Sequence, residues 1–169
     1  MSKKKSIIKT SIDFDIGIGE IIPSTQEAFS NEAYSQVVRK EEKTNLSIFK
    51  HNFLQRVAET LKGKSQFPTN NEVFIFIIQY FDSQREYRSR DIDNMAKTIL
   101  DTLKGKLYQD DGQVKTLLIG KKMEKRVPRN FAYIAIKELK DGRDVDALKI
   151  SGSERSITLF QELKSKGLL

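Results

Sequence analysis

Residues 72–104 read EVFIFIIQYFDSQREYRSRDIDNMAKTILDTLK, and they determine the architecture expected for the chain. The run Val73–Ile78 is continuously apolar and rich in β-branched and aromatic residues. It predicts a strand over Glu72–Phe81 that is buried on both faces. The polar, arginine-bearing stretch Asp82–Arg90 predicts a loop. Apolar residues that share one helical face predict a helix over Asp93–Lys104.

Further elements are expected on both sides of this stretch. Ser11–Gly19 alternates apolar and polar side chains, as a half-buried edge strand does. An apolar residue at every fourth position predicts a helix over Thr44–Lys62. Two more strands are expected at Val114–Lys121 and Phe131–Glu138, joined as a hairpin by the basic segment between them. This order indicates a single α/β or α+β domain, with a mixed β-sheet flanked by helices.

Both ends of the chain are expected to lie outside this domain. Residues 1–10 form a basic tail, residues 11–139 form the domain, and residues 140–169 comprise a polar linker and a C-terminal helix. A short helix is also expected to begin at Ser24, because Glu27 completes the spacing of a capping box.

Composition restricts the classes of function. The 169 residues include no Cys and one His, which excludes disulfides, thiolate zinc sites, iron–sulfur clusters and multi-histidine metal sites. No apolar run approaches the ~18 residues of a membrane span, and the N-terminus does not have the pattern of a secretory signal. The chain is therefore expected to be cytoplasmic, with no membrane partner. Its net charge of +7 fits a polyanionic partner, or serves only solubility.

A group of acidic residues follows the predicted buried strand. Asp91 and Asp93 are two residues apart, so their carboxylates point the same way if the backbone is extended. Lys97 lies one helical turn beyond Asp93, and the turn at Asp110–Asp111 can bring a third carboxylate beside the helix start. Converging carboxylates repel one another unless a divalent cation such as Mg²⁺ binds them. The pattern favours metal-dependent phosphodiester hydrolysis, while helix caps and a simple turn are the structural alternative.

Basic side chains lie close to these carboxylates in the sequence. Six basic residues stand against one Glu between Lys115 and Arg129, which is either a solvated hairpin or a phosphate-contacting surface. Tyr87 is either an exposed loop residue or a platform for an unpaired base. The side chains expected to contact a phosphate backbone are Arg88, Arg90, Lys115, Lys121, Lys122, Lys125, Arg126 and Arg129.

The motifs RDIDNMAKTILDTL at 90–103 and LYQDDGQV at 107–114 resemble the RusA family of Holliday junction resolvases. The resemblance implies a homodimeric, Mg²⁺-dependent endonuclease with no small-molecule cofactor, for which Mn²⁺ is the alternative ion. Such an enzyme cuts four-way DNA junctions by paired symmetric nicks during recombination and repair, in a bacterial or phage setting. The implied site residues are catalytic and metal-binding Asp91, Asp93 and Asp111, catalytic Lys97, and supporting Asn94, Asp101 and Asp110.

Two other functions stay open at this point. One is a non-catalytic DNA-binding protein of the same fold, and the other is a metal-dependent nuclease that also cuts flaps or duplex. Clustered carboxylates argue against the first, because they would repel a polyanion. The leading interpretation requires that Asp91, Asp93 and Asp111 lie close enough to share one metal ion. Asp101 is expected to form an ion pair with Lys97 or to orient it, rather than to bind metal.

Overall fold

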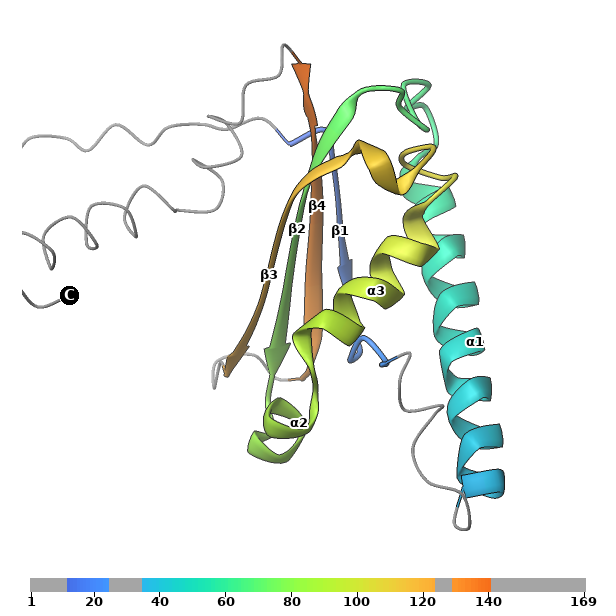
Figure 1. Cartoon of the computed structure of the whole chain (residues 1–169), viewed down its shortest axis with the longest axis vertical. Coiled ribbons are helices and arrows are strands. Elements are labelled where there is room, and N and C mark those ends of the chain that lie inside the picture. The colour runs from blue at the N-terminus through green and yellow to red at the C-terminus, as the bar shows by residue number, and fades with distance from the viewer. Residues whose placement is uncertain (1–11, 25–34, 124–128, 141–169) are drawn as a thin grey trace, which may run out of the picture.

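The computed structural model describes residues 12–24, 35–123 and 129–140 (Figure 1). The basic tail, the short helix expected from Ser24, Lys125, Arg126 and the C-terminal helix lie outside these ranges. The elements are β1 (Phe14–Ile18), α1 (Ser35–Thr60), β2 (Glu72–Phe81), α2 (Gln84–Ser89), α3 (Ile92–Leu103), a 3₁₀ turn (Asp111–Gln113), β3 (Val114–Met123) and β4 (Phe131–Leu139). No helix within these ranges is long and apolar enough to cross a membrane.

The strands form one mixed sheet in the order β1-β4-β2-β3. β2 pairs antiparallel with β4 and parallel with β3, and β1 pairs antiparallel with β4 at the edge. The predicted α+β class with a mixed sheet is therefore confirmed. The predicted hairpin between β3 and β4 is wrong, because β2 lies between them. The parallel β2–β3 pair requires a crossover connection, and α2 and α3 provide it.

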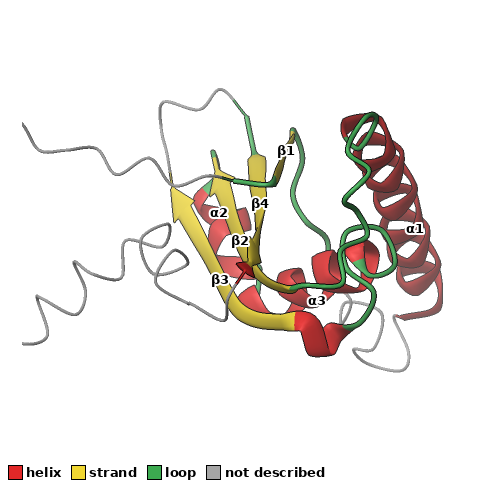
Figure 2. Ribbon diagram, turned by 90° about the horizontal axis from the view of Figure 1, so that it is seen from above, coloured by secondary structure: helices red, strands yellow, loops and turns green. Residues whose placement is uncertain are grey.

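The three helices of the described chain lie on one side of the sheet (Figures 1 and 2). Phe49, Phe53 and Val57 of α1 belong to the same buried core as the apolar face of α3 and the helix-facing side chains of the sheet. The α1 stripe at every fourth position is thus confirmed as core. The helix itself begins nine residues earlier than expected, at Ser35, because the charged sequence before Thr44 shows no apolar period.

The two faces of β2 differ in burial. Val73, Ile75 and Ile77 are fully buried under the helices. On the opposite face Phe74 is buried, but Phe76 and Ile78 are only partly covered. The prediction of a strand buried on both faces is therefore correct for the helix side and only partly correct for the other. The continuous apolar run reflects the central position of β2, with a neighbour strand along each edge.

The stretch predicted as a loop after β2 contains the short helix α2, which is a correction. Tyr87 on this helix packs edge to face against Phe81, with ring centroids 5.9 Å apart. The Arg90 guanidinium binds the Glu86 carboxylate at 3.1 Å across one turn. These contacts stabilise a turn of helix that local composition does not indicate.

Candidate active site

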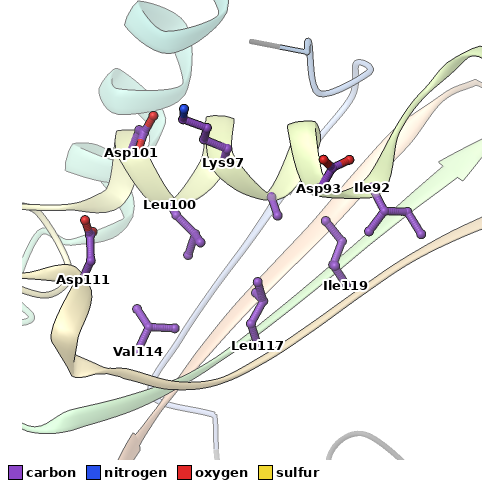
Figure 3. A pocket seen from close by; sticks show the side chains of 10 residues that line it. Ile92, Asp93, Lys97, Leu100, Asp101, Asp111, Val114, Leu117 and Ile119 are labelled. Atoms are coloured by element: carbon purple, nitrogen blue, oxygen red, sulfur yellow. The ribbon is translucent and has the colours of Figure 1, made fainter. Parts of the chain in front are cut away.

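A groove of about 730 Å³ lies between α3 and β3 (Figure 3). Its charged lining consists of Asp93, Lys97 and Asp101 from α3 and of Asp111 from the turn before β3. Its floor is apolar and is formed by Ile92, Ala96, Leu100, Val114, Leu117 and Ile119. The groove therefore combines acidic and basic side chains with an apolar floor.

The charged side chains of α3 share one stripe because they are spaced four residues apart. Asp93, Lys97 and Asp101 are exposed, whereas Met95 and Ile99 on the opposite stripe are fully buried in the core. Burial of that apolar stripe fixes the rotation of the helix, so the charged stripe is left exposed to solvent along the edge of the groove. Although Lys97 and Asp101 are both described, the expected ion pair between them is not formed.

The start of α3 differs from the sequence-based expectation. The helix begins at Ile92, and Asp91 is its N-cap residue in extended conformation, without a side-chain capping hydrogen bond. The backbone is therefore not extended from Asp91 to Asp93. The Asp91 side chain is exposed and does not line the groove. Asn94, expected to be a supporting residue, is buried in the first turn of the same helix.

The turn that carries Asp110 and Asp111 is held by Gln113. The Gln113 side-chain oxygen accepts hydrogen bonds from the backbone N–H groups of Gln109 and Asp110, at 2.7 and 2.9 Å. Its amide nitrogen donates to the carbonyl oxygens of Thr69 and Asn71, at 2.9 and 2.8 Å. The Asp110 side chain accepts from the Gly112 N–H at 3.1 Å, and Asp110 and Gln113 together form a capping box. One glutamine thus anchors the turn to the segment before β2.

Lys104 at the end of α3 binds both carboxylates of this turn. Its Nζ lies 2.9 Å from Asp110 Oδ1 and 3.1 Å from Asp111 Oδ2. Hydrogen bonding to Asp110 and then to Asp111 raises the pKa of Lys104. The same contact with Lys104, followed by the Gly112 N–H, lowers the pKa of Asp110. Lys104 therefore neutralises part of the acidic character that the sequence assigns to this turn.

Replacing Lys104 by Met is expected to raise the pKa of Asp110 toward its ordinary value of 3.8. In the wild type, the stabilisation from this pair is present above that value and is lost as the pH falls through the lowered pKa of Asp110. Carboxyl-detected NMR titration of both proteins measures the change, and Lys106→Met serves as the exposed control. An Asp110 pKa that is the same in all three proteins would show that the pair does not form in solution.

The acidic residues lie at opposite ends of the groove. Asp93 is in the first turn of α3, whereas Asp111 binds Lys104, the C-cap residue of the same helix. A helix of 12 residues is about 18 Å long at ~1.5 Å per residue. In Figure 3, Asp93 and Asp111 accordingly lie apart, with Lys97 and Asp101 along the helix between them. The pKa of Tyr108 is raised mainly by burial of its side chain, and further by the negative charges of Asp111 and Asp101.

The structure does not assemble the predicted three-carboxylate metal site. In the parts of the chain that are described, no three His, Cys, Asp or Glu side chains lie close enough together to hold a metal ion. In this structure Asp91, Asp93 and Asp111 do not lie together as the sequence analysis expects, because the length of α3 separates Asp93 from Asp111. The donor chemistry still fits Mg²⁺, which is commonly bound by one or two carboxylates together with water and substrate phosphate.

The basic side chains expected to contact DNA have separate environments. Lys121 donates hydrogen bonds to two backbone carbonyls, and Arg90 binds Glu86. Lys115 forms an ion pair with Glu72 at 3.5 Å, in which both side chains are about half exposed. Arg88, Lys122 and Arg129 are exposed.

Three residues that position the site were missed by the sequence analysis. Gln113 stands three residues after Asp110, which is the spacing of a capping box and is therefore a usable signal. Lys104 and Gln79 carry no comparable signal. Gln79 is fully buried and accepts a hydrogen bond from the Ile22 N–H at 2.9 Å, which fixes the segment after β1 beside α3. Thr98 of α3 donates to the carbonyl oxygen of Pro23 in that segment, at 2.7 Å.

Comparison with known proteins identifies the family to which the chain belongs. No curated protein sequence matches the chain. A family model described as endodeoxyribonuclease RusA matches residues 19–137, which is more than half of the chain and includes every groove residue. The chain therefore belongs to the RusA family of endodeoxyribonucleases.

Proposed function

We propose that this endodeoxyribonuclease resolves four-way DNA junctions with a Mg²⁺ ion held at the start of α3. The observation that carries the proposal is the α3 stripe, which places Asp93 and Lys97 one helical turn apart on the wall of an open groove. Both side chains are exposed and therefore accessible to a phosphodiester. The position also lies near the carboxyl ends of the parallel strands β2 and β3 (Figure 1), where α/β sheets bind ligands.

Asp93 is the proposed principal metal ligand, and Asp91 is the proposed second ligand. Two carboxylates suffice for Mg²⁺, whose remaining positions are filled by water and phosphate oxygens. When bound, the ion supplies a water of lowered pKa and polarises the phosphoryl oxygen. The N–H groups of the first turn of α3 add partial positive charge toward the same phosphate.

Lys97 is proposed to neutralise the negative charge that develops during hydrolysis. It is exposed, and its side chain forms no ion pair with the described carboxylates of the groove. Its ammonium can therefore turn toward a phosphodiester held at the start of α3. Asp101 and Asp111 are assigned to the opposite end of the groove, where Lys104 and Gln113 hold the turn, so their role would be in positioning.

DNA contacts are proposed for exposed cations on the elements beside this site. Arg88 lies on α2, directly before the start of α3, and Lys122 lies near the end of β3. Lys115 is proposed to exchange its exposed Glu72 partner for a phosphate, because such pairs are weak in water. Arg90 and Lys121 are less available, since their cationic groups are already bound within the protein.

A homodimer is proposed because paired symmetric nicks require two active sites related by a twofold axis. A monomeric nuclease would instead cut one strand at a time. Recombination and repair are the processes in which such four-way junctions arise, and they are the proposed setting of the enzyme.

A cleavage assay on three labelled substrates tests the proposed function. A mobile four-way junction, a flap and a plain duplex are incubated with the full chain, with Mg²⁺, with Mn²⁺ and with excess EDTA. Paired nicks in the junction with either metal, and none with EDTA, are the expected result. Equal cutting of flap or duplex would establish a nuclease of broader range. Junction binding without cutting under all conditions would establish a non-catalytic DNA-binding protein.

A further inference from the structure

Lys121 is a lysine that points inward from the sheet. It lies on β3 opposite Gln79 of β2 in the parallel register, on the helix-facing side. Gln79 is fully buried and Lys121 is partly buried. A cationic side chain in this position is unusual, because the same face of β2 carries the apolar core residues Ile75 and Ile77. Its surroundings must therefore satisfy the ammonium group.

The Lys121 ammonium is bound to α2 and to the connection that leads from α2 into α3. Nζ donates hydrogen bonds to the carbonyl oxygens of Tyr87 and Arg90, at 2.8 and 2.7 Å. It also lies 4.9 Å from the centroid of the Tyr87 ring, within the range of a cation–π contact. Two of its three donors and the adjacent ring thus act on a single short segment of chain.

This segment leads directly into the proposed metal ligands. Arg90 precedes Asp91, the N-cap of α3, and Asp93 follows in the first helical turn. The Arg90 guanidinium is held separately by Glu86, at 3.1 Å. Lys121 on the sheet therefore holds the backbone of Arg90, and Glu86 on α2 holds the side chain of Arg90. Lysine near the end of a helix also interacts favourably with unpaired carbonyl groups there.

We propose that Lys121 is a positioning residue of the nuclease, which fixes the backbone at Arg90 so that the carboxylates of Asp91 and Asp93 keep their place at the start of α3. The proposal rests on the proposed function for its effect on cutting, whereas the positioning itself does not. It also separates Lys121 from Lys122, whose side chain projects from the opposite face of the sheet, where direct DNA contact is proposed.

The test compares Lys121→Met with Lys62→Met, which replaces an exposed lysine in the turn after α1. Met keeps most of the aliphatic chain but removes the charge and the donors. Amide hydrogen exchange of the segment around Arg90 is expected to accelerate by about tenfold or more in Lys121→Met only, because charge-assisted hydrogen bonds are lost. If the Met variant does not fold, the same exchange measurement is made on Lys121→Gln, which keeps an N–H donor.

Kinetics separate positioning from DNA contact. In Lys121→Met, kcat on the junction is expected to fall ~10- to 100-fold, the usual effect of losing a group that orients a metal ligand. Junction Kd and its salt dependence should match those of the wild type. A weaker Kd with a salt slope reduced by about one charge would overturn the proposal, because it would make Lys121 a phosphate contact. Unchanged amide hydrogen exchange around Arg90 in Lys121→Met would also overturn the proposal.

The amide hydrogen exchange measurement tests the positioning role even if the proposed function is wrong. Faster exchange confined to the segment around Arg90 supports the positioning role even where the wild type cuts no junction. Lys121→Arg, which retains the charge and donors, is expected to restore slow exchange at least in part. Faster exchange of the same size in Lys121→Arg and Lys121→Met would overturn the role assigned to the ammonium contacts.

Discussion

Replacing Asp93 by Asn is expected to reduce Mg²⁺-dependent cutting of a four-way junction by more than ~100-fold, because even groups that only orient metal ligands contribute 10- to 100-fold. Asp93 is the carboxylate in the first turn of α3 that lines the groove. The substitution keeps the shape of the side chain while it removes the charge that binds Mg²⁺. Junction Kd should be unchanged or tighter, because a negative charge facing phosphate is lost. Single-turnover cleavage and a binding titration measure the two effects.

Asp15→Asn is the matched control for this substitution. Asp13 and Asp15 have the same spacing as Asp91 and Asp93, but Asp15 lies on the edge strand β1 and does not line the groove. The Asp15 carboxylate accepts a hydrogen bond from the Tyr133 hydroxyl at 3.0 Å. Burial of Tyr133 and, second to it, this hydrogen bond raise the pKa of Tyr133 to about 12. The control should therefore lower the pKa of Tyr133 without affecting cutting. Wild-type cutting by Asp93→Asn would refute the assignment of Asp93.

The secondary structure was largely predictable because most elements have a clear local pattern. The alternation around β1, the apolar run of β2 and the stripe of α3 all reflect the face that each element buries. The pairing of strands was less predictable. Because β3 and β4 follow each other in sequence, local pattern favours a hairpin between them. β2 separates them, and that placement depends on contacts between residues far apart in the chain.

The candidate site was predictable in composition and not in geometry. The spacing of Asp93, Lys97 and Asp101 fixes one helical stripe wherever α3 begins, so that part of the site follows from sequence. The direction of Asp91 depends on whether the helix starts one residue earlier or later, which local pattern does not resolve. The distance from Asp93 to Asp111 depends on the full length of α3, and therefore on tertiary structure.

Replacing Lys97 by Met is expected to lower kcat on the junction by ~100- to 1000-fold, which corresponds to the loss of one charge-stabilising donor in a transition state. Junction Kd should change by less than about threefold, because one exposed cation among many contributes little to binding in moderate salt. Such a split between kcat and Kd identifies a group whose interaction strengthens as the phosphodiester bond breaks. Rapid-quench cleavage and equilibrium binding of the same labelled junction provide the two values.

Lys106→Met is the control for the loss of one exposed positive charge. Lys106 is exposed in the turn after α3 and does not line the groove, so its removal should leave both kcat and Kd unchanged. Equal losses of kcat and affinity in Lys97→Met would instead describe a simple phosphate contact, made equally in the bound substrate and in the transition state. Lys97 differs from Lys104 in having no carboxylate partner among the described side chains. A cation without such a partner is available to the charge that develops on the leaving oxygen, whereas Lys104 is already bound to Asp110 and Asp111.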